Sequence, residues 1–85
     1  MFYTYILESI KNKTLYIGYT SDLKKRFKEH NLGQNTSTKQ FLPWKIIYYE
    51  AYLEIDDAKR RERYFKTSQG RRMLRQRIRK YLFKK

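Results

Sequence analysis

The chain has 85 residues, with 21 Lys and Arg against 8 Asp and Glu, and its formal net charge is +13. This length predicts one domain, residues 1–85, with a small core. The absence of cysteine excludes disulfides and thiolate metal sites. No apolar run approaches membrane-spanning length and the N-terminus has no signal-peptide pattern, so we expect a cytoplasmic chain without membrane contact. Such a high positive charge predicts a polyanionic partner, most simply nucleic acid.

Two strands are predicted at the start of the chain. Residues 2–7 carry largely apolar side chains on both alternating faces, which is typical of a central or well-covered strand. A polar turn follows, in which Asn12 tolerates a left-handed backbone. Residues 14–19 alternate with the period of a half-buried strand that returns antiparallel. Either neighbouring register places Tyr5 and Tyr16 on the same face of this pair.

A short helix is predicted from about Asp22 to Leu32. Three residues at its start can each cap a helix: Thr20, Ser21 and Asp22. Gly33 is a plausible stop. One side of the helix carries Leu23, Phe27 and His30. Arg26 precedes His30 by four residues, so the two side chains lie along the edge of that apolar stripe.

The middle of the chain is predicted to be a loop followed by a third strand. Residues 34–41 are polar, and the loop they form either contacts a ligand or simply connects two elements. Residues 45–52 read as the strand. Pro43 just before it suits a strand start, where the missing N–H costs little.

Two helices are predicted after the third strand. The first runs from about residue 57 to 66 and is capped by Asp56 and Asp57. Gln69 and Gly70 break the pattern, and a basic helix over residues 71–83 follows. The order is therefore β-β-α-β-α-α, and the predicted fold class is α+β, a three-stranded antiparallel sheet flanked by helices.

Glu62 is an unusual residue for its position. On a helix it shares one face with Ala58 and Phe65, which are core candidates. A carboxylate turned toward a sheet must be paired or bind a cation. Two interpretations stay open: an ion pair with a nearby arginine, for which Arg26 is a candidate, or a ligand for a divalent metal such as magnesium.

The chain resembles the GIY-YIG endonuclease superfamily, particularly its small single-domain bacterial members. Tyr16-Ile17-Gly18 matches the second half of the motif, whereas only Tyr5 of Tyr3-Thr4-Tyr5 matches the first half. Downstream, the family's arginine, histidine and glutamate are matched by Arg26, His30 and Glu62. The ordered set of matches, rather than any single residue, carries the resemblance, which covers nearly all of the chain.

The resemblance implies hydrolysis of DNA phosphodiester bonds with one divalent cation, Mg²⁺ or Mn²⁺, held by Glu62. Tyr16, with Tyr5 as the second candidate, would position or deprotonate the attacking water, helped by the cation or by His30. Arg26 would hold the scissile phosphate. The resemblance and the positive charge together predict substrate contacts from Gly18, Lys66, Arg75 and Arg79.

Two features leave alternatives open. Several family members carry an asparagine beyond the glutamate, whereas this chain offers only Ser68 or Gln69 there. With no second domain expected, the chain either cuts structured or damaged DNA, as in DNA repair, or relies on a protein partner for specificity. The alternative function is a nucleic-acid-binding module with weak or no catalysis. Taken singly, each matched residue also fits an ordinary structural role, such as a strand aromatic or a surface arginine.

Overall fold

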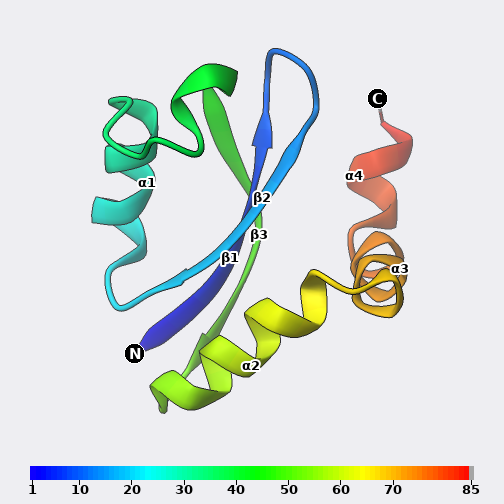
Figure 1. Ribbon diagram of the computed structural model, residues 1–85. Helices are drawn as coiled ribbons and strands as arrows, with labels where there is room; N and C mark the ends of the chain where they lie inside the picture. The colour runs from blue at the N-terminus through cyan, green and yellow to red at the C-terminus, as the bar shows by residue number, and fades with distance from the viewer. Residues whose placement is uncertain (85) are drawn as a thin grey trace.

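The computed structural model describes residues 1–84 as a three-stranded antiparallel sheet with helices on both faces (Figure 1). The elements are β1 (Phe2–Ser9), β2 (Leu15–Thr20), α1 (Leu23–Asn31), the short 3-10 helix η1 (Lys39–Phe41), β3 (Trp44–Tyr52), α2 (Ile55–Phe65), α3 (Ser68–Arg77) and α4 (Arg79–Phe83). The predicted α+β class and the three-stranded antiparallel sheet are confirmed. Within residues 1–84, no helix has the length and apolar character that a membrane crossing requires.

β1 is the central strand, as its two apolar faces predicted, and the sheet order is β2-β1-β3. Tyr5 pairs with Gly18 of β2 on one side and with Tyr49 of β3 on the other. Directly paired residues project on the same face of a sheet. Gly18, Tyr5 and Tyr49 therefore form one row across the face that α1 covers. Tyr16 pairs with Leu7 one step along the same face, so the prediction that it lies beside Tyr5 is confirmed.

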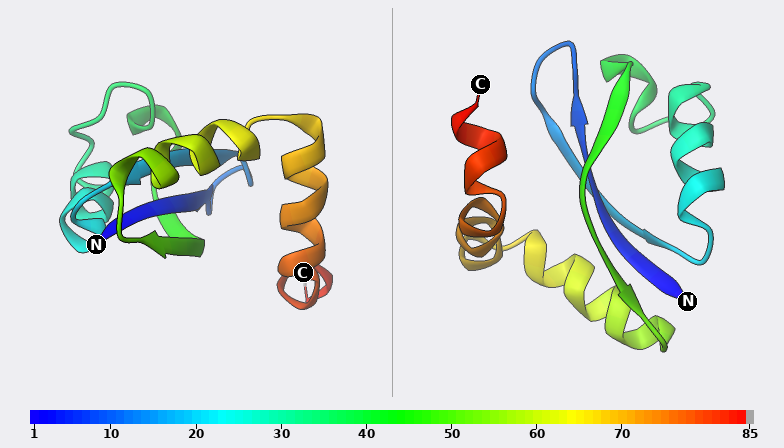
Figure 2. Two further views of the ribbon diagram at one scale, coloured as in Figure 1. Left: turned by 90° about the horizontal axis from the view of Figure 1, so that it is seen from below. Right: turned by 180° about the vertical axis from the view of Figure 1, so that it is seen from behind.

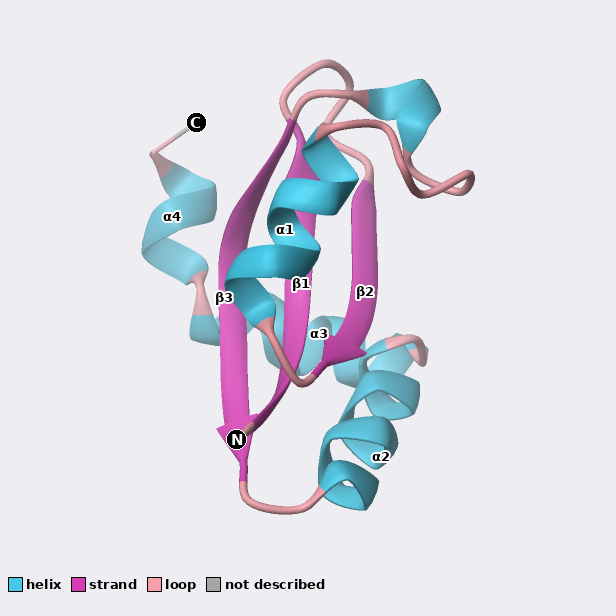
Figure 3. Ribbon diagram, turned by 90° about the vertical axis from the view of Figure 1, so that its left-hand side faces the viewer, coloured by secondary structure: helices cyan, strands magenta, loops and turns pink. Residues whose placement is uncertain are grey.

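Each face of the sheet has its own core. Under α1 the buried residues are Tyr5, Leu7 and Trp44. On the opposite face, Phe65 of α2 and Leu74 of α3 pack on Ile6 and Ile17 of the sheet. Figure 2 shows α1 on one side of the sheet and α3 and α4 on the other. Figure 3 shows that α2 lies behind the sheet, toward β2, which is one of its two edge strands.

The predicted limits of α1 are confirmed. The Asp22 side chain accepts a hydrogen bond from the backbone N–H of Lys25 at 3.1 Å, which caps the helix. Gly33 follows the last turn with φ of 76°, in the left-handed region where glycine carries no steric cost. In the β1–β2 turn the left-handed residue is Lys13, with φ of 68°, and not Asn12 as expected. Asn12 instead accepts a hydrogen bond from the backbone N–H of Thr14 through its side chain.

The predicted cap of α2 is wrong. The helix begins two residues earlier, at Ile55, and its cap position is Glu54, whose side chain makes no capping hydrogen bond. Asp56 and Asp57 lie inside the first turn instead. Carboxylates there interact favourably with the free N–H groups and the positive end of the helix dipole, so these residues stabilise the same helix end by another route.

The predicted single C-terminal helix is two helices, and its expected break at Gln69 and Gly70 lies inside the first of them. Thr67 caps α3 by accepting a hydrogen bond from the Gly70 N–H at 3.0 Å. A Cβ on Gly70 would lie 1.9 Å from the Tyr64 carbonyl oxygen. Gly70 thus permits the close contact of α3 with the end of α2 rather than ending a helix.

Candidate active site

A chain of buried hydrogen bonds links three elements on the α1 face. The Tyr5 hydroxyl of β1 lies 2.9 Å from Nε2 of His30, which projects from α1. On the other side of the ring, His30 Nδ1 lies 2.9 Å from the Thr38 hydroxyl in the segment before η1. Tyr5, His30 and Thr38 are each at most 1% exposed. Such a chain is rigid because every polar atom in it is out of reach of bulk water.

The direction of these bonds follows from Thr38. Its hydroxyl donates its one proton to the Asn35 carbonyl oxygen, at 3.4 Å. Its oxygen therefore accepts the bond from His30 Nδ1–H, and Nε2 of the neutral ring is left as the acceptor. We infer that Tyr5 donates its hydroxyl proton to His30. The Tyr5 oxygen then turns its remaining lone pairs away from the ring.

His30 is held in the neutral form. Burial lowers the pKa of His30 below its ordinary value of 6.5, and the positive charge of Arg26 lowers it further, against the opposing charge of Glu29. A protonated ring would donate from both nitrogens and could no longer accept from Tyr5. The hydrogen-bond chain is therefore intact at neutral pH.

The titration of His30 is directly testable because it is the only histidine. We expect the ring proton signals to titrate with a midpoint below 6.5 in NMR spectra of the folded protein. An unfolded chain takes up this proton near pH 6.5, so the free energy of unfolding should fall as the pH drops below that value, by up to about 1.4 kcal/mol per pH unit. Urea denaturation of the parent and of His30→Gln, which lacks the titrating ring, measures this slope. A midpoint above 6.5 would contradict the inferred chain.

Arg26 is a second partner of the Tyr5 hydroxyl, besides His30. Its interaction with the Tyr5 hydroxyl is the largest influence on Arg26 and raises the pKa of the guanidinium. Burial raises the pKa of Tyr5 to about 12, although Arg26 acts in the opposite direction. Arg26 also forms an ion pair with Glu29 on the same helix, at 3.2 Å, and its side chain is 39% exposed. The guanidinium is thus oriented by two partners while part of it faces solvent.

Gly18 has a role that the sequence did not predict. A Cβ at this position would lie 2.6 Å from the Tyr5 hydroxyl oxygen and 2.7 Å from the ring carbon that bears it. The Tyr5 ring therefore lies across the β2 backbone in the space that a side chain would fill. Glycine is needed here for the close approach of Tyr5, and the proposed approach of substrate to this backbone stays a prediction.

Tyr16 is the more accessible of the two motif tyrosines. Its ring centre lies 4.9 Å from that of His30 and 6.3 Å from that of Tyr5. Tyr16 is only partly buried, whereas Tyr5 is 1% exposed. The two tyrosines therefore differ in environment. Tyr5 is fixed in the buried hydrogen-bond chain, whereas Tyr16 packs on the His30 ring and is partly accessible to solvent.

Glu62 approaches from the opposite face of the sheet, on α2. Its Oε2 accepts a hydrogen bond from Lys66 at 3.0 Å, and its side chain is 18% exposed, at the rim of the core as predicted. Of the two open interpretations, an ion pair is formed, but its partner is Lys66 and not the candidate Arg26, which pairs with Glu29 on its own helix. The negative charge of Glu62 contributes to the raised pKa of Tyr5, so the carboxylate lies within electrostatic reach of the buried hydroxyl.

A second network fixes α2 on the sheet. Arg61, next to Glu62, donates to both carboxylate oxygens of Glu50 on β3, at 2.7 and 3.1 Å. The Tyr48 and Tyr52 hydroxyls donate to the same carboxylate. Burial by itself raises the pKa of Glu50, but these three donors outweigh it and lower that pKa. The bidentate pair sets the rotation of α2 and thereby the direction of Glu62.

Glu62 is the carboxylate of this site that could bind a metal from the rim of the core. Among the residues that the structure describes, no three His, Cys, Asp or Glu side chains gather to enclose an ion. Mg²⁺, however, commonly binds one or two carboxylates and completes its shell with water and phosphate oxygens. Glu62 fits that mode, since its carboxylate is at the rim and its hydrogen-bond partner Lys66 is an exposed, flexible side chain.

The remaining predicted contacts are not part of this group. Arg75 on α3 and Arg79 on α4 are exposed and lie across the sheet from α1 (Figure 1). Ser68 and Gln69, the candidates for the family's asparagine, are exposed at the start of α3. Only Lys66 adjoins the group, through Glu62.

Thr38 is the residue that sequence reasoning missed. It lies in the polar segment 34–41, where no periodic pattern separates a buried threonine from its exposed neighbours. Its backbone oxygen also accepts a hydrogen bond from the Trp44 indole N–H at 2.8 Å. The nearby tryptophan, which needs a buried acceptor, is the one available hint that this segment folds inward.

Comparisons with known proteins show what this chain is similar to. Residues 1–76 match the family model described as the GIY-YIG catalytic domain. A UPF0213 protein of Streptococcus pyogenes serotype M3 is 43% identical over 70 residues, which span 81% of this chain and 75% of that protein. A UPF0213 protein of serotype M1 matches equally well. The solution NMR structure of a UPF0213 protein from Bacillus halodurans is 31% identical, covers 87% of this chain and 82% of that chain, and superposes with a TM-score of 0.53.

Proposed function

Because the chain belongs to the GIY-YIG family of nucleases, we propose that it is a metal-dependent endonuclease that hydrolyses DNA phosphodiester bonds. One observation carries the proposal: the motif residues Tyr5, Gly18, Arg26 and His30 form a single interacting group. A sheet needs no buried His–Tyr hydrogen bond with an arginine beside it for stability alone, whereas phosphate chemistry requires an oriented cation. We further propose that residues 1–85 act as one catalytic domain.

Arg26 holds the scissile phosphate in this proposal. The Thr38–His30–Tyr5 chain presents an oxygen lone pair to Arg26, so that the guanidinium is already oriented when substrate arrives. The planar guanidinium, once oriented, can donate two parallel hydrogen bonds to phosphate oxygens. The same charge offsets the negative charge that develops in the transition state.

Tyr16 is the better candidate to position the attacking water. The pKa of Tyr5 is raised to about 12 by burial, and its proton is engaged by His30, so Tyr5 is a poor base. Tyr16 is more accessible and adjoins the same group. Its hydroxyl can orient a water for in-line attack without leaving the strand.

Glu62 is the proposed ligand of the divalent cation. Lys66, which donates a hydrogen bond to its carboxylate, then releases it and contacts the DNA backbone instead. When bound, Mg²⁺ or Mn²⁺ would polarise the phosphate and stabilise the leaving oxygen. The protein's own contribution is the fixed direction of α2, set by the Arg61–Glu50 pair. Further backbone contacts are proposed from Arg75 and Arg79, since the net charge of +13 favours a polyanion.

The test is cleavage of labelled linear, nicked, flapped, branched and single-stranded DNA with Mg²⁺ or Mn²⁺, by the parent and by Glu62→Gln. We expect the parent to cleave at least one structured DNA. Glu62→Gln should cleave about 100-fold more slowly, because a neutral amide is a weak ligand for a hard cation.

Glu54→Gln is the matched control. Glu54 stands at the N-cap position of α2, the helix that carries Glu62; it is exposed, and its side chain makes no capping hydrogen bond. It should retain the parent's rate. Thermal melting should show both variants folded. Equal rates for Glu62→Gln and the parent would refute the role of Glu62.

A binding module without catalysis is the second candidate. It is favoured by the position of the exposed arginines on α3 and α4, which lie across the sheet from Arg26. Tight, salt-dependent binding without cleavage of any DNA in the panel would support it.

A further inference from the structure

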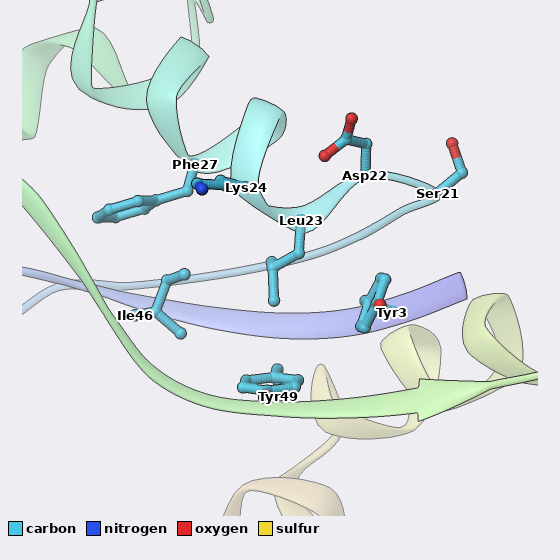
Figure 4. A pocket seen from close by; sticks show the side chains of 8 residues that line it. All are labelled: Tyr3, Ser21, Asp22, Leu23, Lys24, Phe27, Ile46 and Tyr49. Carbon is cyan, nitrogen blue, oxygen red and sulfur yellow. The ribbon is translucent and has the colours of Figure 1, made fainter. Parts of the chain in front are cut away.

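A pocket lies on the α1 face, on the side of that helix away from the candidate active site. It has a volume of about 420 Å³ and lies between α1 and β3 (Figure 4). We call it the aromatic pocket; it is lined by Tyr3, Ser21, Asp22, Leu23, Lys24, Phe27, Ile46 and Tyr49. Its size is in the range of sites that hold small planar ligands.

The pocket offers a ring surface for stacking. Tyr3 and Tyr49 meet edge to face with ring centres 6.1 Å apart. Tyr49 is nevertheless 54% exposed, an unusual value for an aromatic residue in the middle of a strand. Figure 4 shows the Tyr49 ring at the β3 side, with Leu23 and Phe27 projecting from α1. A flat ligand can enter between the Tyr49 ring and these apolar side chains.

The aromatic pocket adjoins the candidate active site through the sheet. Tyr5 is flanked by Gly18 on one side and by Tyr49 on the other, in one row of the sheet. A second depression, lined by Arg26, shares Ser21 and Asp22 with the pocket at the start of α1. DNA with a phosphate at Arg26 can therefore pass this end of the helix and place a neighbouring base at Tyr49.

The charges around the pocket favour a nucleic acid over an apolar peptide. Lys24 lines the pocket, and Lys25 and Arg26 line the second depression together with Glu29, whose charge is paired with Arg26. The acidic residue that lines the pocket itself, Asp22, is engaged by the Lys25 N–H as the helix cap. An aromatic surface bordered by cations suits a base with its flanking phosphates.

We propose that the aromatic pocket binds one unstacked nucleobase of a single-stranded DNA segment beside the phosphate at Arg26. The inference rests on the proposed function for the position of that phosphate. The base stacks on Tyr49, and Lys24 contacts the adjoining backbone. A requirement for an unpaired base would direct the protein to frayed, flapped or branched DNA.

Binding is tested in EDTA, so that cleavage plays no part. The probes are single-stranded oligonucleotides in which 2-aminopurine, a fluorescent base, replaces one nucleotide at a time. We expect quenching at one position when the parent binds, because stacking quenches this base. Tyr49→Ala should abolish the quenching and weaken binding about 5- to 100-fold, whereas Tyr49→Phe, which keeps the ring, should preserve both.

Leu53→Ala is the control, because Leu53 is an exposed apolar side chain just after β3, 81% exposed, and lines neither the aromatic pocket nor the second depression. It should leave quenching unchanged. The dependence of affinity on salt should stay the same in Tyr49→Ala, since no phosphate contact is removed.

Two results would overturn the proposal: affinity that does not change in Tyr49→Ala, or equally tight binding of an oligonucleotide in which the quenched position is abasic. Either result would leave the nuclease proposal standing if the parent cleaves DNA in Mg²⁺. Conversely, quenching that depends on Tyr49 without any cleavage would support the pocket and refute the nuclease.

Discussion

Arg26→Lys should cleave DNA about 1,000-fold more slowly than the parent while remaining folded. Lysine keeps the positive charge but offers a point charge in place of the planar fork. It cannot both pair with Glu29 and contact the Tyr5 oxygen while directing two donors at a phosphate. Loss of an oriented donor to a charged transition state typically costs 10² to 10³ in rate, and an arginine on a transferring phosphoryl group contributes about 10³ or more.

The matched control is Lys25→Ala, which removes a charge from the neighbouring position of the same helix. Long-range attraction of DNA depends on net charge, so this variant should lose only a few-fold in rate, and the loss should shrink at higher salt. The free energy of unfolding should change by no more than about 0.5 kcal/mol in Arg26→Lys, whose side chain is 39% exposed. Comparable losses in the two variants would mean that Arg26 contributes only general charge.

Gly18→Ala should lower both activity and stability. The added Cβ would lie 2.6 Å from the Tyr5 hydroxyl, and the Tyr5 ring cannot move away freely because it is buried and bonded to His30. Overpacking of this kind costs about 1 to 3 kcal/mol. Displacement of the hydroxyl also removes the oxygen that orients Arg26, so the guanidinium is no longer held in position for the phosphate. We therefore expect the rate of cleavage to fall about 100-fold.

A double-mutant cycle separates this mechanism from a general defect in β2. Tyr5→Leu removes the hydroxyl and the ring carbon that the new Cβ would meet. In the Tyr5→Leu background, Gly18→Ala should therefore cost much less stability than in the parent. Chemical denaturation measures both free energies. An equal cost in the two backgrounds would show that Gly18 serves the backbone of β2 and not the Tyr5 ring.

Local patterns determined the elements of this protein. Alternation along residues 2–7 and 14–19 predicted the hairpin, and apolar residues on both faces of the first strand predicted its central position. The helix spacing of Arg26 and His30 predicted that the two side chains lie along one edge of the helix, and both interact with the Tyr5 hydroxyl in the structure. These predictions succeeded because each depends on neighbours within about one turn or one strand.

Predictions that depended on distant partners failed. The sequence named Arg26 as a candidate partner in one of two open interpretations of Glu62, but each charge pairs within its own helix: Arg26 with Glu29 and Glu62 with Lys66. The sequence predicted a helix break at Gln69 and Gly70, but the missing side chain of Gly70 permits a close contact with the Tyr64 carbonyl. Composition does not reveal such contacts, because the partner is fixed only when two helices pack.

The sequence by itself determined the sheet and the helix that carries Arg26 and His30, and it singled out Tyr5, Gly18, Arg26 and His30 as candidates. Only the tertiary structure decided how that set is connected. It selected Thr38 from a polar segment to fix the His30 ring, and it brought Arg61 onto Glu50 to orient α2. It also left Tyr49 exposed beside the buried Tyr5. The physical reason is that burial and hydrogen-bond direction are properties of the packed chain, whereas periodicity is a property of each segment.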